Sequence, residues 1–444
     1  MNTRQNRRSG QAPAGTSARN AALRALFAVL EKGETLDEAL ARELASADLA
    51  VHPSDRAFAR AIVTLVLRRL GQVDDLLASL LDRPLPARAG RAVNLLRIGA
   101  AELLFLGSAQ HAAVNCAVDL AAADRNTRPY RGLINAVLRR ITREGPALIE
   151  HQDAARLNTP DWAWKSWSGA YGAETARAIA EAHLAEPPLD ISVRARPEDW
   201  AKKLSGALLP TGSIRLSHAG RIEDLPDFTE GGWWVQDAAA ALPAKLLGEV
   251  SGTPVLDLCA APGGKTLELA AAGASVTAVD RAGGRLERLR ANLKRTRLNA
   301  EIVKADLLDW APPQQFPKIL LDAPCSATGT ARRHPDVLRL KDTEEVASLA
   351  ALQANLLARA ASWLSPGGTL VYCTCSLEPL EGPAQIGLFL KNNPAFARVP
   401  IGAAEIGGLN ECLTPEGDLR TLPCHMADTG GMDGFFAARL TRTD

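Results

Sequence analysis

The chain has 444 residues, of which 47% are hydrophobic and 23% are charged, and its formal net charge is +1. This composition is typical of a globular protein with two or three domains, and no run of about eighteen apolar residues is present to span a membrane. Because the net charge is so close to zero, it gives no support for nucleic-acid binding. Such binding has to be argued from local basic patches.

The N-terminal residues and the cysteines indicate the compartment. Residues 1–17 are rich in Gly, Ser and Arg and contain no acid and no apolar core, which predicts a disordered basic arm rather than a secretory signal. The seven cysteines form no spaced disulfide framework, which favours free thiols. We therefore expect a cytoplasmic protein.

Residues 18–145 are predicted to be almost wholly helical. Apolar residues recur at three- and four-residue spacing, as at Leu23, Leu26 and Leu30. Proline-containing pairs interrupt the pattern and separate the helices. A small surplus of Lys and Arg over Asp and Glu makes this segment a mildly basic helical bundle.

Residues 146–235 change in character. Tryptophans cluster in this segment, and a short strand-like run at 189–194 follows two prolines. The mixture predicts a small α+β connector subdomain.

Residues 236–444 alternate between strand and helix, which predicts an α/β Rossmann-like domain. The expected strands are short apolar runs at 254–258, 275–279, 301–305, 318–321 and 369–372. The expected helices lie at 264–272, 281–294 and 343–364. This alternation implies a parallel sheet with helices on both faces, and ligands of such sheets bind at the carboxyl ends of the strands.

A nucleoside pocket is predicted at the ends of the first three strands. The first strand leads into Gly263 and Gly264, which allow a tight turn and a close approach to a ligand. The second strand ends in Asp280, placed to bind ribose hydroxyls, and the third ends in Asp306, suited to an exocyclic amine or ring edge.

Two other nucleotide sites compete for these residues. The Gly264-Lys265-Thr266 run resembles the end of a phosphate-binding P-loop, but that motif needs a glycine where Cys259 stands. A nicotinamide site needs G-x-G-x-x-G after the first strand, and residues 260–264 do not supply it. A third interpretation is that Gly263 and Gly264 form a turn without any ligand. That interpretation does not explain why Asp280 and Asp306 stand at the ends of the next two strands.

Two cysteines follow the fourth and fifth expected strands. Cys325 lies three residues after Asp322, and Cys375 follows the last of these strands. Because the two strands are expected to be neighbours in a doubly wound sheet, both thiols and the carboxylate should converge beside the nucleoside pocket. A nearby cation, Lys265 or Arg333, is suited to lowering the pKa of a thiol there.

Two plainer interpretations of the cysteines are weighed against this. A buried cysteine is usually a small apolar residue. Cys373 and Cys375 form a C-x-C pair, but no second ligand pair of defined spacing accompanies them, so we expect no metal. Cys373 is expected to pack within its strand, on the face of Cys375 but one step deeper.

The motifs around these residues resemble those of a known family. Residues 257–266 (DLCAAPGGKT), 322–326 (DAPCS), 374–376 (TCS) and 431–439 (GMDGFFAAR) are similar to the signature motifs of the RNA 5-methylcytosine methyltransferases. The resemblance implies S-adenosyl-L-methionine (SAM) as the cofactor. The implied SAM contacts are Cys259, Ala260, Ala261, Pro262, Gly263, Gly264, Lys265, Asp280, Arg285, Asp306 and Asp322.

The family pattern also implies roles for the catalytic residues. Cys375 would add to C6 of a cytosine and thereby activate C5 for methylation. Cys325 would assist release of the product by removing the C5 proton, and Asp322 would contact the N3 edge of the base. Cys373 stands where the family more often has Ser or Ala.

The helical segment carries a second resemblance, to the NusB-type RNA-binding fold. It rests on residues 55–60 (DRAFAR), 111–115 (HAAVN) and 132–140 (GLINAVLRR). The joining of this domain to the catalytic domain implies 16S ribosomal RNA as the substrate, at a cytosine of the type numbered 967 in the reference rRNA. A tRNA cytosine-C5 methyltransferase and a non-catalytic RNA-binding ribosome assembly factor are the alternatives, and we expect a monomer.

A cytosine within a stem must be flipped out before a thiol can reach it. Arg332 and Arg333 follow the Cys325 loop directly. We therefore expect these two side chains to contact RNA phosphates. Residues 281–304 also carry a surplus of Lys and Arg.

Overall fold

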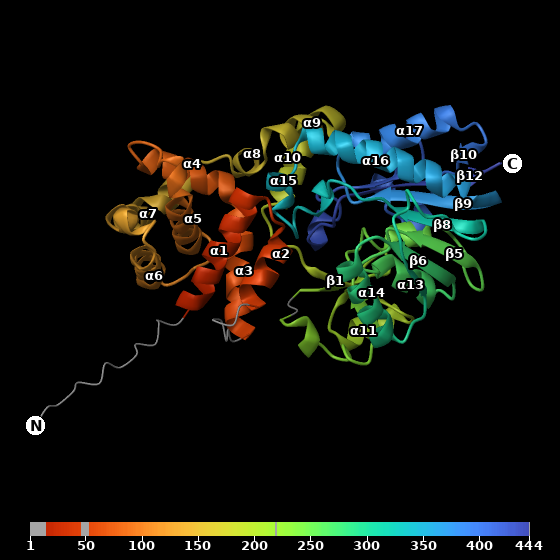
Figure 1. Cartoon of the computed structure of the whole chain (residues 1–444), viewed down its shortest axis with the longest axis horizontal. Coiled ribbons are helices and arrows are strands. Elements are labelled where there is room, and N and C mark those ends of the chain that lie inside the picture. The colour runs from red at the N-terminus through yellow and green to blue at the C-terminus, as the bar shows by residue number, and fades with distance from the viewer. Residues whose placement is uncertain (1–14, 46–52, 218–219, 444) are drawn as a thin grey trace, which may run out of the picture. The chain divides into compact units, whose positions relative to one another are not determined.

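The computed structural model describes residues 15–45, 53–217 and 220–443 (Figure 1). The chain divides into two compact units, Met1–Pro160 with His334–Leu340, and Asp161–Arg333 with Lys341–Asp444. The chain therefore leaves the second unit after Arg333, contributes seven residues to the first, and returns. Residues 1–14 of the expected basic arm lie outside the described residues, and the first described helix begins at Thr16.

The first unit is helical, as the sequence predicts. Its helices are α1 Thr16–Lys32, α2 Leu36–Ala45, α3 Pro53–Arg68, α4 Leu70–Leu80, α5 Gly90–Leu104, α6 Gln110–Ala123, α7 Arg131–Glu150, α8 Ala154–Asn158 and α15 Val337–Leu340. Their apolar faces form one core that includes Leu26, Ile62, Leu96 and Leu138. The domain boundary expected at residue 145 falls inside α7.

Residues 161–235 combine helices with a small antiparallel sheet. The elements are α9 Asp161–Tyr171, α10 Ala173–Ala182, β1 Leu189–Val193, α11 Pro197–Lys203, β2 Ala207–Leu208, β3 Ile214–Leu216 and β4 Trp233–Val235. The sheet order is β2-β3-β1-β4. This part belongs to the second compact unit, together with the larger sheet.

The larger sheet carries the expected strand–helix alternation. Its strands are β5 Pro254–Leu258, β6 Ser275–Asp280, β7 Glu301–Lys304, β8 Phe316–Asp322, β9 Leu364–Thr374, β10 Phe396–Arg398, β11 Leu419–Thr421 and β12 Phe435–Arg442. The helices are α12 Leu242–Lys245, α13 Gly264–Ala271, α14 Gly283–Thr296, α16 Thr343–Ser362 and α17 Pro383–Asn392. The order β10-β12-β9-β8-β5-β6-β7 makes β8 and β9 neighbours, as predicted.

Alternate residues of each central strand supply two separate cores. Leu256, Ile319 and Leu370 face one side and pack with α16 and α17 residues, whereas Leu320 and Val371 face the other and pack with α12, α13 and α14 (Figure 1). Because a strand alternates its side chains between faces, the continuous apolar runs in the sequence reflect burial on both sides.

One edge of the sheet departs from the expectation of a parallel sheet. β5 to β9 are parallel, but β12 pairs antiparallel with β9, and β10 and β11 pair antiparallel with β12. Helix α17, β10 and β11 lie between β9 and β12 in the chain, and β12 returns beside β9 in the opposite direction. Among the described residues, no helix is long and apolar enough to cross a membrane.

Candidate active site

The loop between β5 and α13 takes conformations that its sequence makes accessible. Gly263 has φ +109°, and a Cβ atom there would lie 2.2 Å from Cδ1 of Leu289. Only glycine therefore fits, because it has no Cβ and tolerates a positive φ. Cys259 begins the loop at φ +59°, and the Ala261–Pro262 peptide bond is cis.

Asp257, the polar residue of β5, holds the start of α13 through a hydrogen bond. Asp257 is fully buried, and its Oδ2 accepts a 2.6 Å hydrogen bond from Oγ1 of Thr266 at the start of α13. Burial raises the pKa of Asp257 to about 7, with Asp322 and Asp280 adding to the effect of burial against Thr266 and Lys265. Burial likewise raises the pKa of Cys259, so this thiol stays protonated at neutral pH.

A cavity of about 190 Å³ lies at the ends of β5, β6 and β7. It is lined by Cys259, Asp280, Arg281, Ala282, Arg285, Ala305, Asp306, Leu307, Pro324, Leu352 and Leu356. Four of the residues that the sequence assigns to the cofactor therefore surround one space: Cys259, Asp280, Arg285 and Asp306. Carboxylates at one wall and leucines at another suit a nucleoside, whose ribose is polar and whose base is flat and apolar.

Hydrogen bonds to the loop backbone orient the polar wall of this cavity. Oδ2 of Asp280 accepts from the Ala261 amide at 3.1 Å, and Oδ1 accepts from the Ala282 amide at 2.8 Å. The guanidinium of Arg285 donates to the carbonyl oxygen of Ala261. Oδ1 of Asp306 accepts from the Leu308 amide at 3.0 Å. The carboxylates are thus held in place before any ligand binds.

Lys265 and Asp322 form an ion pair between the cavity and the cysteines. Nζ of Lys265 donates to Oδ2 of Asp322 at 2.8 Å. Burial disfavours the ammonium, but the attraction of Asp322 outweighs it and raises the pKa of Lys265. Sγ of Cys373 donates to Oδ1 of Asp322 at 3.4 Å. Cys373 is fully buried on the core face that Cys375 also contacts, which confirms the position predicted for it.

The two cysteines that follow β8 and β9 lie side by side. Sγ of Cys325 is 3.4 Å from Sγ of Cys375, and both residues are partly exposed. The backbone joins their loops, because the Gly329 amide donates to the Cys375 carbonyl oxygen at 3.0 Å. The hydrogen bond to Cys375 and burial raise the pKa of the Cys325 thiol well above its usual value. Either thiol is able to donate to the other across this contact.

The two arginines expected to contact RNA are both engaged in contacts within the protein. The Arg332 side chain is 2% exposed and donates to the Gly430 carbonyl oxygen at 2.8 Å. Arg333 donates to Asp433 at 3.1 Å, to Asp237 at 2.5 Å and to the Pro188 carbonyl oxygen at 3.2 Å. Arg333 is also bound away from the thiols, so it does not serve to lower their pKa.

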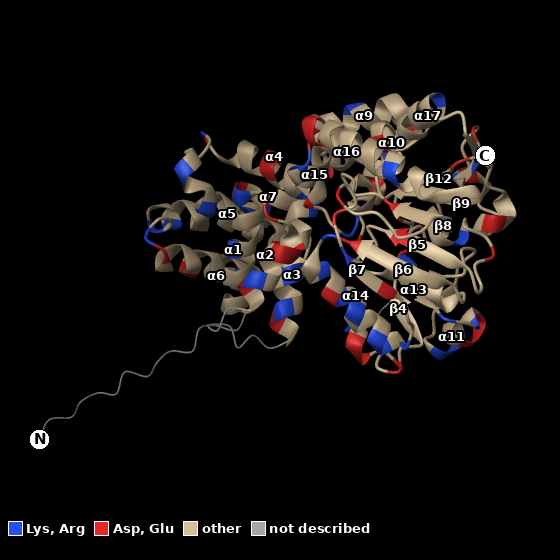
Figure 2. Ribbon diagram, turned by 45° about the vertical axis from the view of Figure 1, so that its right-hand side comes forward, with Lys and Arg blue, Asp and Glu red and all other residues tan. Residues whose placement is uncertain are grey.

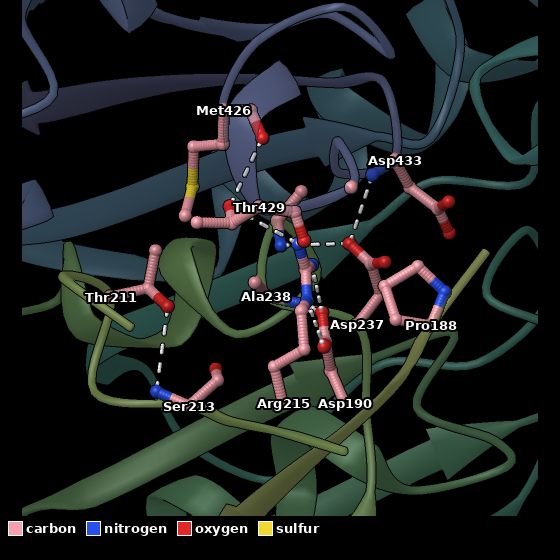
Figure 3. Close-up of polar contacts among 12 residues, drawn as sticks. Pro188, Asp190, Thr211, Ser213, Arg215, Asp237, Ala238, Met426, Thr429 and Asp433 are labelled. Atoms are coloured by element: carbon pink, nitrogen blue, oxygen red, sulfur yellow. Dashed lines mark hydrogen bonds and ion pairs between the residues drawn. The ribbon is translucent and has the colours of Figure 1, made fainter. Parts of the chain in front are cut away.

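These arginines belong to a buried network that the sequence did not reveal. Arg215 of β3 donates to both carboxylate oxygens of Asp190 of β1 at 2.7 Å and to the Thr429 carbonyl oxygen (Figure 3). Oδ1 of Asp237 accepts from the Asp433 amide at 3.1 Å (Figure 3). The acids in this network are far away in the sequence from the arginines. No local sequence pattern therefore predicts which partners the arginines bind.

Other Lys and Arg side chains do reach the surface. Helix α14 and the residues around it carry exposed basic side chains (Figure 2), namely Arg281, Arg285, Arg288, Arg290, Lys294, Arg297 and Lys304. Several of them have acidic neighbours, such as Glu287 beside Arg290 and Glu230 beside Arg297. Sequence reasoning also missed a buried glutamate, Glu381, behind the cysteine loops.

Comparison with known proteins links both units to established families. Residues 244–441 match the family described as 16S rRNA methyltransferase RsmB/F, and residues 16–143 match the NusB family. "Ribosomal RNA small subunit methyltransferase B" of Pseudomonas putida is 36% identical over 96% of this chain and 98% of its own length.

Two solved structures share the fold. The crystal structure of PH0851 covers 97% of this chain and 99% of its own, with a TM-score of 0.75 and 23% identity. A methyltransferase homolog protein from Pyrococcus horikoshii covers 63% of this chain and 93% of its own, with a TM-score of 0.53 and 28% identity.

Proposed function

The chain belongs to the RsmB/F family of 16S rRNA methyltransferases, and from this premise we propose how it methylates its substrate. The enzyme is a SAM-dependent rRNA methyltransferase. The proposed reaction transfers a methyl group to C5 of a cytosine in 16S rRNA through a covalent bond between Cys375 and C6 of the base. One observation carries this proposal: two thiols 3.4 Å apart at the ends of neighbouring strands.

The residues around the 190 Å³ cavity fit SAM. Asp280 is proposed to bind the ribose, Asp306 the adenine edge, and the loop of residues 259–265 the rest of the cofactor, with Arg285 supporting that loop. Lys265 and Asp322 lie at the side of this loop that faces the cysteines. SAM supplies the methyl group when it is bound.

Cys375 is proposed as the nucleophile. C5 of cytosine is a poor nucleophile until a thiolate adds to C6, which moves electron density to C5. Cys325 lies in hydrogen-bond contact with Cys375, so the two thiols can act on the same base. The Lys265 ammonium lies close enough to interact electrostatically with Cys375.

Cys325 is proposed to remove the C5 proton after methyl transfer. Its pKa is raised first of all by the hydrogen bond to Cys375, then by burial and the charge of Cys375. Once Cys375 is bonded to C6, its charge no longer raises the pKa of Cys325, so Cys325 can lose its own proton to solvent and the resulting thiolate can take the C5 proton. Loss of the C5 proton then lets the bond between C6 and Cys375 break.

Asp322 is proposed to contact the base. Its side chain is 30% exposed, the more accessible member of its pair with Lys265. The carboxylate is able to accept from the exocyclic amine of cytosine, or to contact N3 through a water. The proposed steps use thiols and carboxylates of one chain, so we propose a monomer that needs no metal.

The relatives favour ribosomal RNA over tRNA as the substrate, and an rRNA substrate implies action in the cytoplasm. A cytosine of the 967 type remains the proposed target. The test is to incubate the protein with SAM and small-subunit rRNA and to map 5-methylcytosine. A protein that incorporates no methyl group would be a non-catalytic assembly factor.

Three cysteine variants separate the proposed roles. Cys375→Ala should abolish both turnover and the covalent protein–RNA adduct. Cys325→Ala should lose about 10²–10⁴-fold in turnover, as expected for a missing general base, and should accumulate an adduct that survives denaturation. Cys424→Ala, a cysteine outside the site, is the matched control and should behave as the native protein. Normal turnover by Cys325→Ala would refute its assigned role.

A further inference from the structure

A fully buried glutamate lies behind the two cysteine loops. Glu381 ends the short helical turn Pro379–Glu381 that follows β9, and its side chain is inaccessible to solvent. Its Oε1 accepts from the Ser326 amide at 2.8 Å and from Nε2 of Gln353 at 2.9 Å. Its Oε2 accepts from Oγ of Ser376 at 2.5 Å and from Oγ of Ser326. One carboxylate therefore receives four hydrogen bonds.

The donors are the residues next to the two reactive cysteines. Ser326 follows Cys325 on the loop after β8, and Ser376 follows Cys375 at the end of β9. Oγ of Ser326 is 3.1 Å from Oγ of Ser376, so the two loops meet at this carboxylate as well as at the thiols. The same carboxylate thus joins two segments that are 50 residues apart.

Helix α16 completes the attachment. Nε2 of Gln353 donates to Oε1 of Glu381 and also, at 2.9 Å, to the Pro324 carbonyl oxygen on the other side of Cys325. Oε1 of Gln353 in turn accepts from the hydroxyl of Tyr372 in β9 at 3.1 Å. The Cys325 loop is therefore held on both sides of the cysteine by hydrogen bonds from the buried side chain of Gln353 and to that of Glu381.

Packing alone does not account for a carboxylate here. Burying an ionised side chain is unfavourable unless its oxygens are fully hydrogen-bonded, and an apolar residue fills such a space at lower cost. Among the described residues, no Lys or Arg nitrogen lies within 4 Å of Glu381 to form an ion pair. Its oxygens accept from the donors that it holds in place, and Arg420 lies close by and donates to the Ser376 carbonyl oxygen.

We propose that Glu381 is a positioning residue, which clamps the Ser326 and Ser376 loops and so sets the distance between the thiols of Cys325 and Cys375. It acts through its neighbours and touches no substrate. The effect of Glu381 on turnover rests on the proposed two-cysteine reaction. Its effect on the distance between the thiols does not depend on that reaction. These two aspects are therefore measured separately.

The first measurement is disulfide formation between Cys325 and Cys375 with diamide, which takes up the two hydrogens and two electrons of the thiols. Peptide mapping by mass spectrometry follows the linked pair over time. Glu381→Gln replaces one acceptor oxygen by an NH₂ group, so two serine hydroxyls lose the oxygen to which they donate. We expect the disulfide to form about tenfold more slowly, as for loss of a buried charged hydrogen bond.

The matched control is Glu378→Gln. Glu378 is another buried glutamate of the same loop, but its carboxylate accepts mainly from Oγ of Ser166 and Nε1 of Trp167 on α9, with Thr328 as a further donor from the Cys325 loop. Its disulfide rate should remain that of the native protein. An equal slowing in both variants would overturn the proposal, because any loss of buried charge would then suffice.

The second measurement is steady-state turnover. Glu381→Gln should lower kcat by about 100-fold, as expected when reacting groups are misplaced by about 1 Å, with the KM for SAM within about twofold of native. A native disulfide rate in Glu381→Gln would overturn the proposal. A slowed disulfide with native kcat would support the clamp and show instead that the two-cysteine reaction is wrong.

Serine variants keep the inference testable if Glu381→Gln does not fold. Ser326→Ala and Ser376→Ala each remove one side of the clamp, and each should slow disulfide formation, with the double variant slowest. Native rates in both single variants and in the double variant would overturn the proposal.

Discussion

Asp257 shows how a single buried acid couples the site to pH. It lies at the end of β5, and its Oδ2 is held by Thr266. Burial raises the pKa of Asp257 from 3.8 to about 7. The folded state therefore binds this proton more tightly than the unfolded chain does. The resulting stability is fully present below pH 3.8 and is lost as the pH rises through about 7.

We predict that Asp257→Asn becomes progressively more stable than the native protein as the pH rises from about 4 to 7. The difference should grow by on the order of 4 kcal/mol, since one pKa unit corresponds to about 1.4 kcal/mol. Urea unfolding without SAM at pH 4.5, 6 and 7.5 measures it. A difference that does not change with pH would contradict the prediction.

At the scale of elements, the loop after Cys325 depends on a charge network built by distant strands. Arg333 links Asp237, which precedes α12, to Asp433, which precedes β12. Burial opposes the ionised Asp237, but Arg333 outweighs it and lowers the pKa of that carboxyl. The network joins the small antiparallel sheet, the cysteine loop and the C-terminal segment.

Arg333→Ala should therefore unfold the protein more readily rather than weaken RNA binding alone. Removal of Arg333 leaves Asp237 buried without its ion-pair partner and leaves Asp433 with Arg332 alone, which costs about 3–5 kcal/mol. Chemical denaturation measures this loss. Arg288→Ala on the exposed face of α14 is the control and should change stability by less than about 0.5 kcal/mol.

The opposite outcome has a clear meaning. If Arg333→Ala kept native stability but bound rRNA more weakly, with a shallower dependence on salt, the arginine would contact phosphate as first expected. The sequence placed Arg333 correctly after the cysteine loop but had no means to show which acids surround it.

At the scale of the whole molecule, the chain passes from the methyltransferase unit into the helical unit and back. Segment His334–Leu340 belongs to the helical unit, although it directly follows the loop that begins at Cys325. Within that unit Oδ2 of Asp336 accepts from the Leu36 amide at 2.9 Å, at the start of α2. An inserted carboxylate thus satisfies a helix donor that has no partner within its helix.

We predict that Asp336→Ala loosens the start of α2. The Leu36 amide would lose a buried acceptor, a loss of about 1–3 kcal/mol, and its hydrogen exchange should accelerate. The control is Asp342→Ala, because Asp342 accepts from the Glu344 and Glu345 amides at the start of α16. That variant should speed exchange in α16 and leave α2 as it is. Unchanged exchange at Leu36 would exclude the role of Asp336.

The features that depend on local patterns could be predicted from the amino-acid sequence. Strand–helix alternation, the glycine turn at Gly263, and the acids and cysteines after strands are readable because each is set by neighbouring residues. The predicted neighbours β8 and β9 bring Cys325 and Cys375 together as expected. The two families to which the units belong were also recognisable from short motifs.

The features that depend on distant partners could be identified only from the folded chain. The burial of Arg333 requires Asp237 and Asp433, the clamp at Glu381 requires Ser326 and Gln353, and the antiparallel edge requires the return of β12. The sequence around a charged residue does not show whether its side chain is solvated or paired with a buried acid. The partner, and therefore the role, exists only once the chain has folded.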